Sequence, residues 1–466
     1  MNIKPFILTT IALLGGMNVS AQFSHNKDKF LGNITTSYNV DYGKEKFYTL
    51  WNQITAEKES YWDVIEGSRR GSFNFSGSDK AYNYARQHNF PFKYNCLIWG
   101  EHYPNWLNNL SKEEQYKAIE EYMDGVKKHY PELQLIDVVN EAVPGHHPAP
   151  YKDALGGDGK TGYDWIIKAF EMAYERWPDA ILIYNDYNTF EGQKSEFIDL
   201  VRTLRDAGAP IDAYGCQSHE LINMSETNFK SAMKEIQAAL KMPMYCTEYD
   251  IGTSDDNLQL QRYKEQIPYM WEADYVAGIT LWGYIYGKTQ TTDGNSGLIK
   301  DGIYRPAMIW LYEHMSSDAA NNAISPFPGM VKEASVYVKP AAITVPKGNA
   351  VPVTVRARLR TKAIERVELY VDGMLLTTMT EAPYTTEFTP ENTGRHDLKA
   401  IVYATDGTAF ERLSGVTVYT SGIMAINETN TDDANVNGAS YNISGQRVDD
   451  NYKGITIVNG KKMMKK

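Results

Sequence analysis

Residues 133–143 read LQLIDVVNEAV, an apolar run that ends in an amide and a carboxylate side by side, Asn140 and Glu141. The apolar part is typical of a buried strand in a parallel sheet. At the carboxyl end of a parallel barrel strand, polar side chains project into a pocket rather than into the core. The stretch therefore predicts a parallel strand that carries Asn140 and Glu141 to a site.

Seven further apolar runs, separated by longer stretches, lie between residues 31 and 315. They begin at Leu31, Tyr48, Phe92, Ala180, Asp212, Pro243 and Ala277. Apolar residues at three and four spacing predict amphipathic helices that begin near Glu113, Trp165 and Glu226. Eight strand and helix units predict an α/β fold, a (β/α)8 TIM barrel over residues 22–318, with its active site at the strand carboxyl ends.

The character of the chain changes after the predicted barrel. Residues 319–331 are small, polar and Pro-containing, as in a linker. Residues 332–421 hold only short strand-like runs with Asp-Gly turn signals at Asp372 and Asp406, which predicts an all-β Ig-like sandwich. The missing Cys-Trp-Cys core indicates a bacterial type of module. Residues 422–466 form a polar linker and an apolar, basic tail.

Bulk properties narrow the range of partners. The chain has 466 residues, 42% of them hydrophobic, which is enough for more than one domain. A net charge of -11 leaves no broad basic surface, so nucleic acid is not an expected partner. Thirty-three Tyr and nine Trp favour a sugar-binding surface, although aromatic residues also fill cores.

The N-terminus, residues 1–21, is predicted to be a signal peptide. Lys4 precedes an apolar run over residues 5–17, and Val19-Ser20-Ala21 has the form of a cleavage site. The alternative is a membrane anchor, but the run is short for a bilayer. No Cys follows the cleavage site, so a lipoprotein anchor is not indicated. We expect a secreted or cell-surface protein with no membrane span in its mature form.

Three cysteines, Cys96, Cys216 and Cys246, lie in apolar stretches. Their odd number and scattered positions favour buried free thiols over a disulfide framework or a metal site. No Cys/His cluster implies a metal or an organic cofactor, so we expect neither.

A second predicted strand also ends in acidic side chains. MYCTEYDI carries Glu248 and Asp250 at its end, and Glu248 follows Glu141 by 107 residues. Barrel closure could bring Glu141 and Glu248 face to face. Such a pair is what glycoside hydrolysis requires, because one carboxyl protonates the leaving oxygen while the other attacks the anomeric carbon or activates water.

Neighbouring strand ends supply further polar and aromatic groups, namely Trp99, Asn185, Gln217, His219 and Trp282. Sugar sites combine amide and imidazole groups for hydroxyls with flat aromatic faces for the rings. His219 alone would most often be a surface residue. Here it can pair with Asp250 and hydrogen-bond the nucleophile.

Seven blocks resemble the signature blocks of family 10 glycoside hydrolases, which are chiefly retaining endo-β-1,4-xylanases. In order they are NQITAEKESYWDVIE, LIWGEHYPNW, IDVVNEA, YNDYN, GCQSHE, CTEYDI and TLWGY. The resemblance covers about residues 30–315, and RPAMIWL at its end is similar to xylanases of the Bacteroidetes type. It implies Glu141 as acid/base and Glu248 as nucleophile, supported by Asn140, His219 and Asp250. It further implies that the sugar-binding residues include Glu57, Asn185, Trp99, Gln217 and Trp282.

Five positions depart from the usual family pattern. Lys58 stands in place of an Asn, Tyr61 of a Lys, Asn95 of a His, His102 of a Gln and Gln290 of a Trp. Most of these positions bind sugars on the non-reducing side of the cleavage point. Losing such contacts should cost on the order of 1–3 kcal/mol each for plain xylan, unless another sugar replaces them.

The last 26 residues, 441–466, are similar to the C-terminal sorting signals of Bacteroidetes. The alternative is a last strand of the sandwich followed by a basic tail. For the whole chain we expect a monomeric, secreted, retaining endo-β-1,4-xylanase whose partner is a polysaccharide. A β-glycanase for decorated xylan or another polysaccharide is the alternative, and a non-catalytic glycan-binding protein is a further one.

Overall fold

The computed structural model describes residues 23–291 and 294–420, together with four short strands further on. Those strands, β19 to β22, form an antiparallel sheet in the order β20-β19-β21-β22. Their bounds are Ser440–Asn442, Arg447–Val448, Gly454–Val458 and Lys461–Lys465. The predicted signal peptide, nearly all of the predicted polar linker and part of the predicted sorting-signal-like tail lie outside the described residues.

Eight parallel strands close into a barrel in chain order, which confirms the predicted fold class. Closure is made by β1 and β8, where Leu31 pairs with Ile279. The strands are β1 Phe30–Ile34, β2 Ile54–Thr55, β3 Phe92–Trp99, β4 Leu135–Asn140, β5 Ile181–Asp186, β6 Ala213–Cys216, β7 Met244–Tyr249 and β8 Val276–Leu281. Nearly all their residues are buried, as expected of a sheet covered on both faces.

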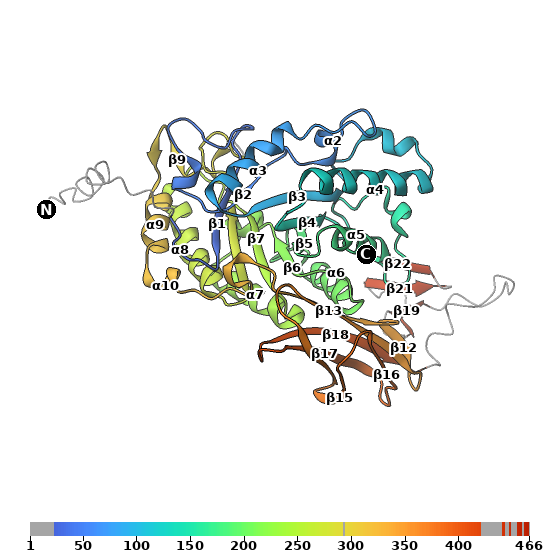
Figure 1. Cartoon of the computed structure of the whole chain (residues 1–466). Coiled ribbons are helices and arrows are strands. Elements are labelled where there is room, and N and C mark those ends of the chain that lie inside the picture. Colours follow the sequence, from blue (N-terminus) through green and yellow to red (C-terminus); the bar gives the residue numbers. More distant parts are fainter. Residues whose placement is uncertain are drawn as a thin grey trace.

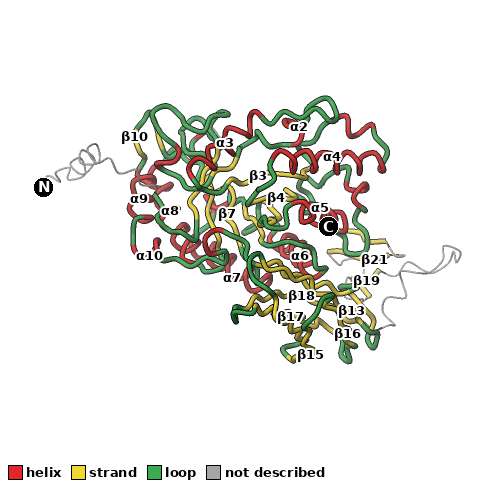
Figure 2. The backbone as a smooth tube through the Cα atoms, viewed as in Figure 1, coloured by secondary structure: helices red, strands yellow, loops and turns green. Residues whose placement is uncertain are grey.

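Helices surround the strands, as Figures 1 and 2 show. The α-helices are α2 Trp62–Ile65, α3 Ser76–His88, α4 Lys112–His129, α5 Asp164–Arg176, α6 Lys194–Asp206, α7 Glu226–Leu240, α8 Asp256–Glu272, α9 Pro306–Met315 and α10 Asp318–Asn321. Short 3-10 helices and strands complete the loops, namely η2 Phe47–Thr49, η3 Asn105–Asn109, η4 Lys152–Leu155, η5 His219–Asn223, η7 Pro328–Met330, β9 Ile299–Lys300 and β10 Ile303–Tyr304. Among the described helices, none is long and apolar enough to cross a membrane.

The second barrel strand is shorter than its sequence suggests. The apolar run from Tyr48 predicts one long strand, but only β2 pairs in the barrel, after the turn η2. Phe47 and Trp51 are both buried, and the Trp51 N–H donates to the Phe47 carbonyl at 3.0 Å. The helical turn lets both rings pack against Tyr284, whereas an extended strand would space the two residues roughly 13 Å apart.

The C-terminal module is a sandwich of two sheets, which confirms the Ig-like prediction. One sheet has the order β11-β13-β16 and the other β12-β18-β17-β14-β15. The strands are β11 Ala334–Pro340, β12 Thr344–Pro346, β13 Val351–Leu359, β14 Ile364–Val371, β15 Met374–Met379, β16 Tyr384–Phe388, β17 Gly394–Ala404 and β18 Ala409–Tyr419. The predicted hairpin turn joins β14 to β15, with φ of 50° at Asp372 and 81° at Gly373.

The module docks on the base of the barrel, at the amino ends of the strands, and lies beside α6 in Figure 1. Asp212, directly before β6, accepts from Lys332 Nζ at 2.8 Å and from the Tyr337 hydroxyl at 2.8 Å. All three side chains are buried. Gly208, at the end of α6, lies so close to β11 that a Cβ there would meet Lys339 Cβ at 2.6 Å. The barrel and the module therefore share a tightly packed, charge-paired interface.

The region predicted as a linker, residues 319–331, also packs against the barrel. It contains most of α10. Ala320 of this helix is buried, and its carbonyl accepts from Trp271 Nε1 at 2.8 Å. The small residues that suggest a loose connection instead permit close contact with α8 and α9.

Candidate active site

The side chains predicted to carry the chemistry meet in one pocket at the carboxyl ends of the barrel strands. The pocket has a volume of about 280 Å³. Its lining residues are Tyr61, Asn95, Trp99, Glu101, Asn140, Glu141, His147, Tyr187, Gln217, His219, Glu248, Trp282 and Gln290. A larger cavity of about 640 Å³ lies at the base, between the barrel and the module, and holds none of the predicted site residues.

Glu141 is a buried carboxyl that receives a hydrogen bond on each oxygen. Gln217 Nε2 donates to Oε1 at 2.8 Å, and Trp99 Nε1 donates to Oε2 at 3.0 Å. Burial raises the pKa of Glu141 to about 7, and the Glu248 charge adds to that rise, while the hydrogen bond from Gln217 opposes it. This carboxyl can therefore hold a proton near neutral pH and give it up within the pocket.

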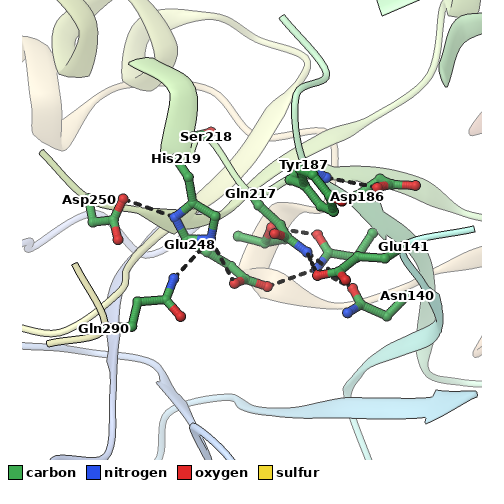
Figure 3. A network of polar contacts seen from close by, with 12 residues as sticks. Asn140, Glu141, Asp186, Tyr187, Gln217, Ser218, His219, Glu248, Asp250 and Gln290 are labelled. Atoms are coloured by element: carbon green, nitrogen blue, oxygen red, sulfur yellow. Dashed lines mark hydrogen bonds and ion pairs between the residues drawn. The ribbon is translucent and has the colours of Figure 1, made fainter. Parts of the chain in front are cut away.

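Glu248 lies across from Glu141 and also accepts on both oxygens, as Figure 3 shows. Asn185 Nδ2 donates to Oε1 at 2.9 Å, and His219 Nε2 lies 3.3 Å from Oε2. The other ring nitrogen of His219 lies 2.9 Å from Asp250 Oδ1. Burial alone would lower the pKa of His219, but the two carboxylates outweigh it and raise that pKa well above its usual value.

Asn185 connects the two acidic strand ends. Its Oδ1 accepts from the Thr247 hydroxyl at 2.6 Å, which fixes the amide so that Nδ2 donates to both Asn140 Oδ1 and Glu248 Oε1, each at 2.9 Å. Gln217 Nε2 approaches the same Asn140 oxygen at 3.4 Å. Because its oxygen is occupied, Asn140 presents its amide nitrogen to the pocket.

The backbone turns sharply where the site begins, which explains why the apolar run ends in polar residues. Glu141 has a φ of 56°, in the left-handed region that non-glycine residues rarely adopt. Its N–H donates to the Asn185 carbonyl at 2.9 Å, and its carbonyl accepts from the His147 N–H at 2.8 Å. The chain therefore leaves the sheet at Glu141 and points this side chain into the pocket.

Three of the five positions that depart from the family pattern line the pocket. Tyr61 packs edge-on against Trp99, with ring centroids 5.2 Å apart. Asn95 is buried, and among the described residues its Oδ1 has no hydrogen-bond partner. Gln290 Nε2 lies 3.2 Å from His219 Nε2. Figure 3 shows Gln290 grouped with His219 beside Glu248.

The remaining predicted residues lie behind the pocket or beside it. Lys58 Nζ is 3.9 Å from Glu57 Oε1, and burial raises the pKa of Glu57 while Lys58 opposes the rise. His102 stacks on Tyr61 at 4.4 Å and pairs with Asp63 at 3.0 Å. Asn185 and Asp250 act on pocket residues through the hydrogen bonds described above. None of these five predicted residues contributes to the pocket lining.

The sequence does not predict three of the residues that line the pocket, namely Glu101, His147 and Tyr187. Tyr187 belongs to the YNDYN block and directly follows β5, so its position at a strand end was a usable signal. Glu101 and His147 follow β3 and β4 after short turns that no local pattern predicts.

One group of possible metal ligands occurs among the described residues, formed by Glu101, Glu141 and His147. Their donor atoms lie within 4.8 Å of one another, and two of the three residues are exposed. Exposed acidic groups commonly gather in this way without an ion. The expectation of a reaction without metal or cofactor stays a prediction.

The family model for glycosyl hydrolase family 10 matches residues 21–308, and the model for a bacterial Ig domain matches residues 337–400. The chain belongs to glycosyl hydrolase family 10. The two matched ranges coincide with the barrel and with most of the module.

This family 10 protein is similar to several curated enzymes. It is 44% identical over 284 residues to endo-1,4-beta-xylanase B of Cellvibrio japonicus, a match that covers 61% of this chain and 45% of that enzyme. It is 34% identical over 209 residues to endo-1,4-beta-xylanase B of Thermotoga neapolitana, covering 43% of this chain and 59% of that enzyme. The chain thus spans about half the length of these two relatives.

Solved structures share the fold of the barrel. Native xylanase 10B from Thermotoga maritima superposes with a TM-score of 0.54 at 22% identity, covering 63% of this chain and 96% of that one. A family 10 structure from Paenibacillus barcinonensis gives 0.55 at 24% identity, covering 62% and 95%. At these identities the likeness extends to the fold alone.

Proposed function

We propose that the protein is a retaining endo-1,4-β-xylanase. One observation carries the proposal: Glu141 and Glu248, from the ends of β4 and β7, line the same pocket and are linked by hydrogen bonds through Gln217, Asn140 and Asn185. Of the two, Glu141 has its pKa raised to about 7 by burial, which suits a proton donor. The similarity to curated endo-xylanases supports the choice of substrate.

The proposed reaction has two steps. First, Glu141 protonates the glycosidic oxygen while Glu248 attacks the anomeric carbon, which releases the leaving sugar and forms a glycosyl-enzyme. Glu141, now ionised, then removes a proton from water, and the water oxygen displaces Glu248. Atoms and charge balance, because the proton that Glu141 gives in the first step returns in the second.

The neighbouring side chains have supporting roles in this proposal. His219 and Asn185 donate hydrogen bonds to Glu248, and Asp250 holds the His219 ring in the orientation that allows this. The amide nitrogen of Asn140 faces the pocket, where it can donate to a hydroxyl of the sugar under attack. Trp99, Gln217 and Trp282 would contact the same sugar.

A second candidate keeps the chemistry and changes the polysaccharide. Tyr61, Asn95 and Gln290 line the pocket where other family members carry Lys, His and Trp. An aromatic ring and two amides make different contacts from two cations and an indole. A decorated xylan or another β-glycan could therefore be the better substrate.

The test is a product profile over plain xylan, substituted xylans and mixed-linkage β-glucan, with the anomeric configuration of each new end followed by NMR. The proposal expects cleavage within the chain of xylan and retained β-configuration. Preference for a substituted xylan or a glucan would favour the second candidate. The Glu248→Gln variant should lose nearly all activity, and an unchanged rate would disprove the assignment of the nucleophile. Wild-type protein that binds but hydrolyses none of these glycans would be a glycan-binding protein.

Export belongs to the same proposal. The signal-like residues 1–21 and the tail resembling a sorting signal both favour a secreted or cell-surface enzyme. N-terminal sequencing of the protein recovered outside the cell should begin at Gln22. Recovery of the protein only inside the cell would contradict it.

A further inference from the structure

His146 lies beside the pocket rather than in it. Its side chain is 2% exposed, and its ring stacks on the ring of Tyr187 with centroids 3.7 Å apart and planes 14° from parallel. Tyr187, in contrast, lines the pocket. One face of the tyrosine is therefore covered by the imidazole.

Both nitrogens of His146 have oxygen partners. Nδ1 lies 2.6 Å from Asp186 Oδ1, and Nε2 lies 2.5 Å from Gln193 Oε1. Two oxygen acceptors require both ring N–H groups, which only the charged imidazolium has. Burial would lower the pKa of His146, but Asp186 and Gln193 outweigh it and raise that pKa. The ring thus has a single orientation.

Asp186 is itself fixed, so the histidine is held by a rigid partner. Its Oδ2 accepts from the Tyr184 hydroxyl at 2.5 Å and from the Val143 N–H at 3.0 Å. Its Oδ1 also accepts from the Tyr187 N–H at 2.9 Å. The same carboxylate therefore orients the His146 ring and the backbone of the tyrosine stacked on it.

Tyr187 lies on the side of the pocket where a leaving group would sit. Figure 3 shows His219, Asp250 and Gln290 grouped around Glu248, whereas Tyr187 lies toward Glu141. In the proposed reaction Glu141 protonates the oxygen of the departing sugar. Flat aromatic faces are suited to sugar rings, so the open face of Tyr187 is where that sugar would rest.

We propose that His146 is a positioning residue, whose imidazolium holds the Tyr187 ring as a fixed platform for the sugar on the leaving-group side. The inference rests on the proposed function and goes beyond it, because it assigns selectivity for leaving group and acceptor to a residue outside the pocket. His146 touches no reacting atom and acts through Tyr187, the pocket residue on which it stacks.

The test measures how the glycosyl-enzyme divides between an acceptor sugar and water. The donor is 2,4-dinitrophenyl β-xylobioside, whose leaving group needs no proton, and the acceptor is xylotriose. Transfer gives xylopentaose, while released dinitrophenolate counts every turnover. The ratio of the two does not depend on how much enzyme is folded, so partial loss of a destabilised variant leaves it unchanged.

In His146→Leu, which lacks both the ring and its N–H groups, this ratio should fall on the order of tenfold, as expected when a positioned group shifts by a fraction of an ångström. His146→Phe keeps a ring against Tyr187 and should lose less. With xylohexaose as substrate, His146→Leu should raise KM more than it lowers kcat.

The matched control is His129→Phe, at the end of α4. His129 also stacks on an aromatic ring, Phe75 at 4.0 Å, and pairs with a carboxylate, Asp79 at 2.7 Å, but far from the site. Its ratio should equal that of wild type. Equal ratios for His146→Leu and wild type would overturn the inference while the proposed function stands. A wild type that releases no dinitrophenolate would overturn both.

Discussion

At the scale of single residues, Glu141 balances opposing influences. Burial favours its neutral form, while the donors Gln217 and Trp99 favour its charged form, and burial is the largest of these effects. A carboxyl with a pKa of about 7 is protonated through the acidic range and can still act as a base once ionised.

Replacement of this carboxyl tests its role as proton donor. Glu141→Gln should lower kcat/KM on xylan by roughly 10²- to 10⁴-fold, the usual contribution of general acid–base catalysis. Release of dinitrophenolate from an activated xyloside should fall much less in the first turnover, because that leaving group needs no proton. Glu113→Gln, an exposed change on α4, serves as the control and should behave as wild type. Equal losses on both substrates would contradict the assignment.

The pH dependence offers a second test at this scale. Because Glu141 must be protonated to act as an acid, kcat/KM should fall as the pH rises through about 7. The Gln217 hydrogen bond stabilises the carboxylate, so Gln217→Leu should raise the pKa of Glu141 and move this alkaline limb to higher pH. A pH–rate profile of both proteins decides the point. A limb that moves to lower pH would show that Gln217 does not act through this hydrogen bond.

The sequence predicts the acidic residues better than the groups around them. Glu141 and Glu248 could be found because each stands at the end of an apolar run, Glu141 directly after β4 and Glu248 near the end of β7. His146 could not, because its partners Asp186 and Gln193 are 40 and 47 residues away and meet it only after loop closure. The family resemblance implies Glu57, Lys58 and His102 as sugar-binding positions, but a sequence block does not specify which of its side chains faces the pocket.

At the scale of elements, β6 lies between β5 and β7 and carries a glycine, Gly215, where the neighbouring side chains leave no room for a Cβ. A Cβ on Gly215 would lie 2.5 Å from Asn185 Oδ1 and 2.9 Å from Thr247 Cγ2. The Thr247 hydroxyl holds the Asn185 amide, and that amide in turn donates to Glu248. The glycine is needed here for close approach of neighbouring strands, not for an unusual φ.

Gly215→Ala should therefore displace Asn185. We expect a loss of about 1–3 kcal/mol in the free energy of unfolding, as for other overpacked cores, together with a fall in kcat. Thermal unfolding and steady-state kinetics measure the two effects. Gly348→Ala, in the Ig-like module, is the control for a loss of stability without displacement of Asn185: its φ of 82° adds strain, a Cβ there meets nothing within 4 Å, and kcat should be unchanged. Unchanged kinetics in Gly215→Ala would show that Asn185 tolerates displacement.

Element boundaries can be predicted from local patterns where one face of the element is buried. The prediction fails where a turn replaces part of the expected strand or helix. α7 begins and ends where its apolar spacing predicts, because Ser225 caps it and Leu240 closes its buried face. The strand predicted from Tyr48 is too long, because a helical turn that buries Phe47 and Trp51 precedes β2. The 3-10 helix η5, which carries His219, also has no sequence signature of its own.

At the scale of the whole molecule, the Ig-like module and the barrel share buried charges. Lys332 contacts Asp212, the Ala180 carbonyl at 2.8 Å and the Tyr337 hydroxyl at 3.2 Å. Arg395 and Ser414 of the module both bind Asp206 at the end of α6. An isolated barrel would lose the module's contacts to these acids and keep only those from Arg205 to Asp206 and from the Leu182 N–H to Asp212 among the ones described.

Lys332→Met should lower the free energy of unfolding by about 3–5 kcal/mol, because it leaves Asp212 buried without its cation. Chemical denaturation monitored by fluorescence measures the loss. Lys339→Met is the matched control, since Lys339 is half exposed and lies 3.7 Å from Glu171, and it should change stability by less than about 1 kcal/mol. Similar losses in both variants would mean that the buried Lys332–Asp212 pair contributes no more to the free energy of unfolding than the exposed one.

The position of the module also decides how the proposed enzyme can meet a solid surface. The module contacts the barrel at its base and along α5 and α6, so its described residues leave the strand ends that hold the pocket uncovered. An insoluble polysaccharide presents a surface rather than free chains. A molecule built in this way can lie with its working face flat against such a surface, with the module on the side away from it.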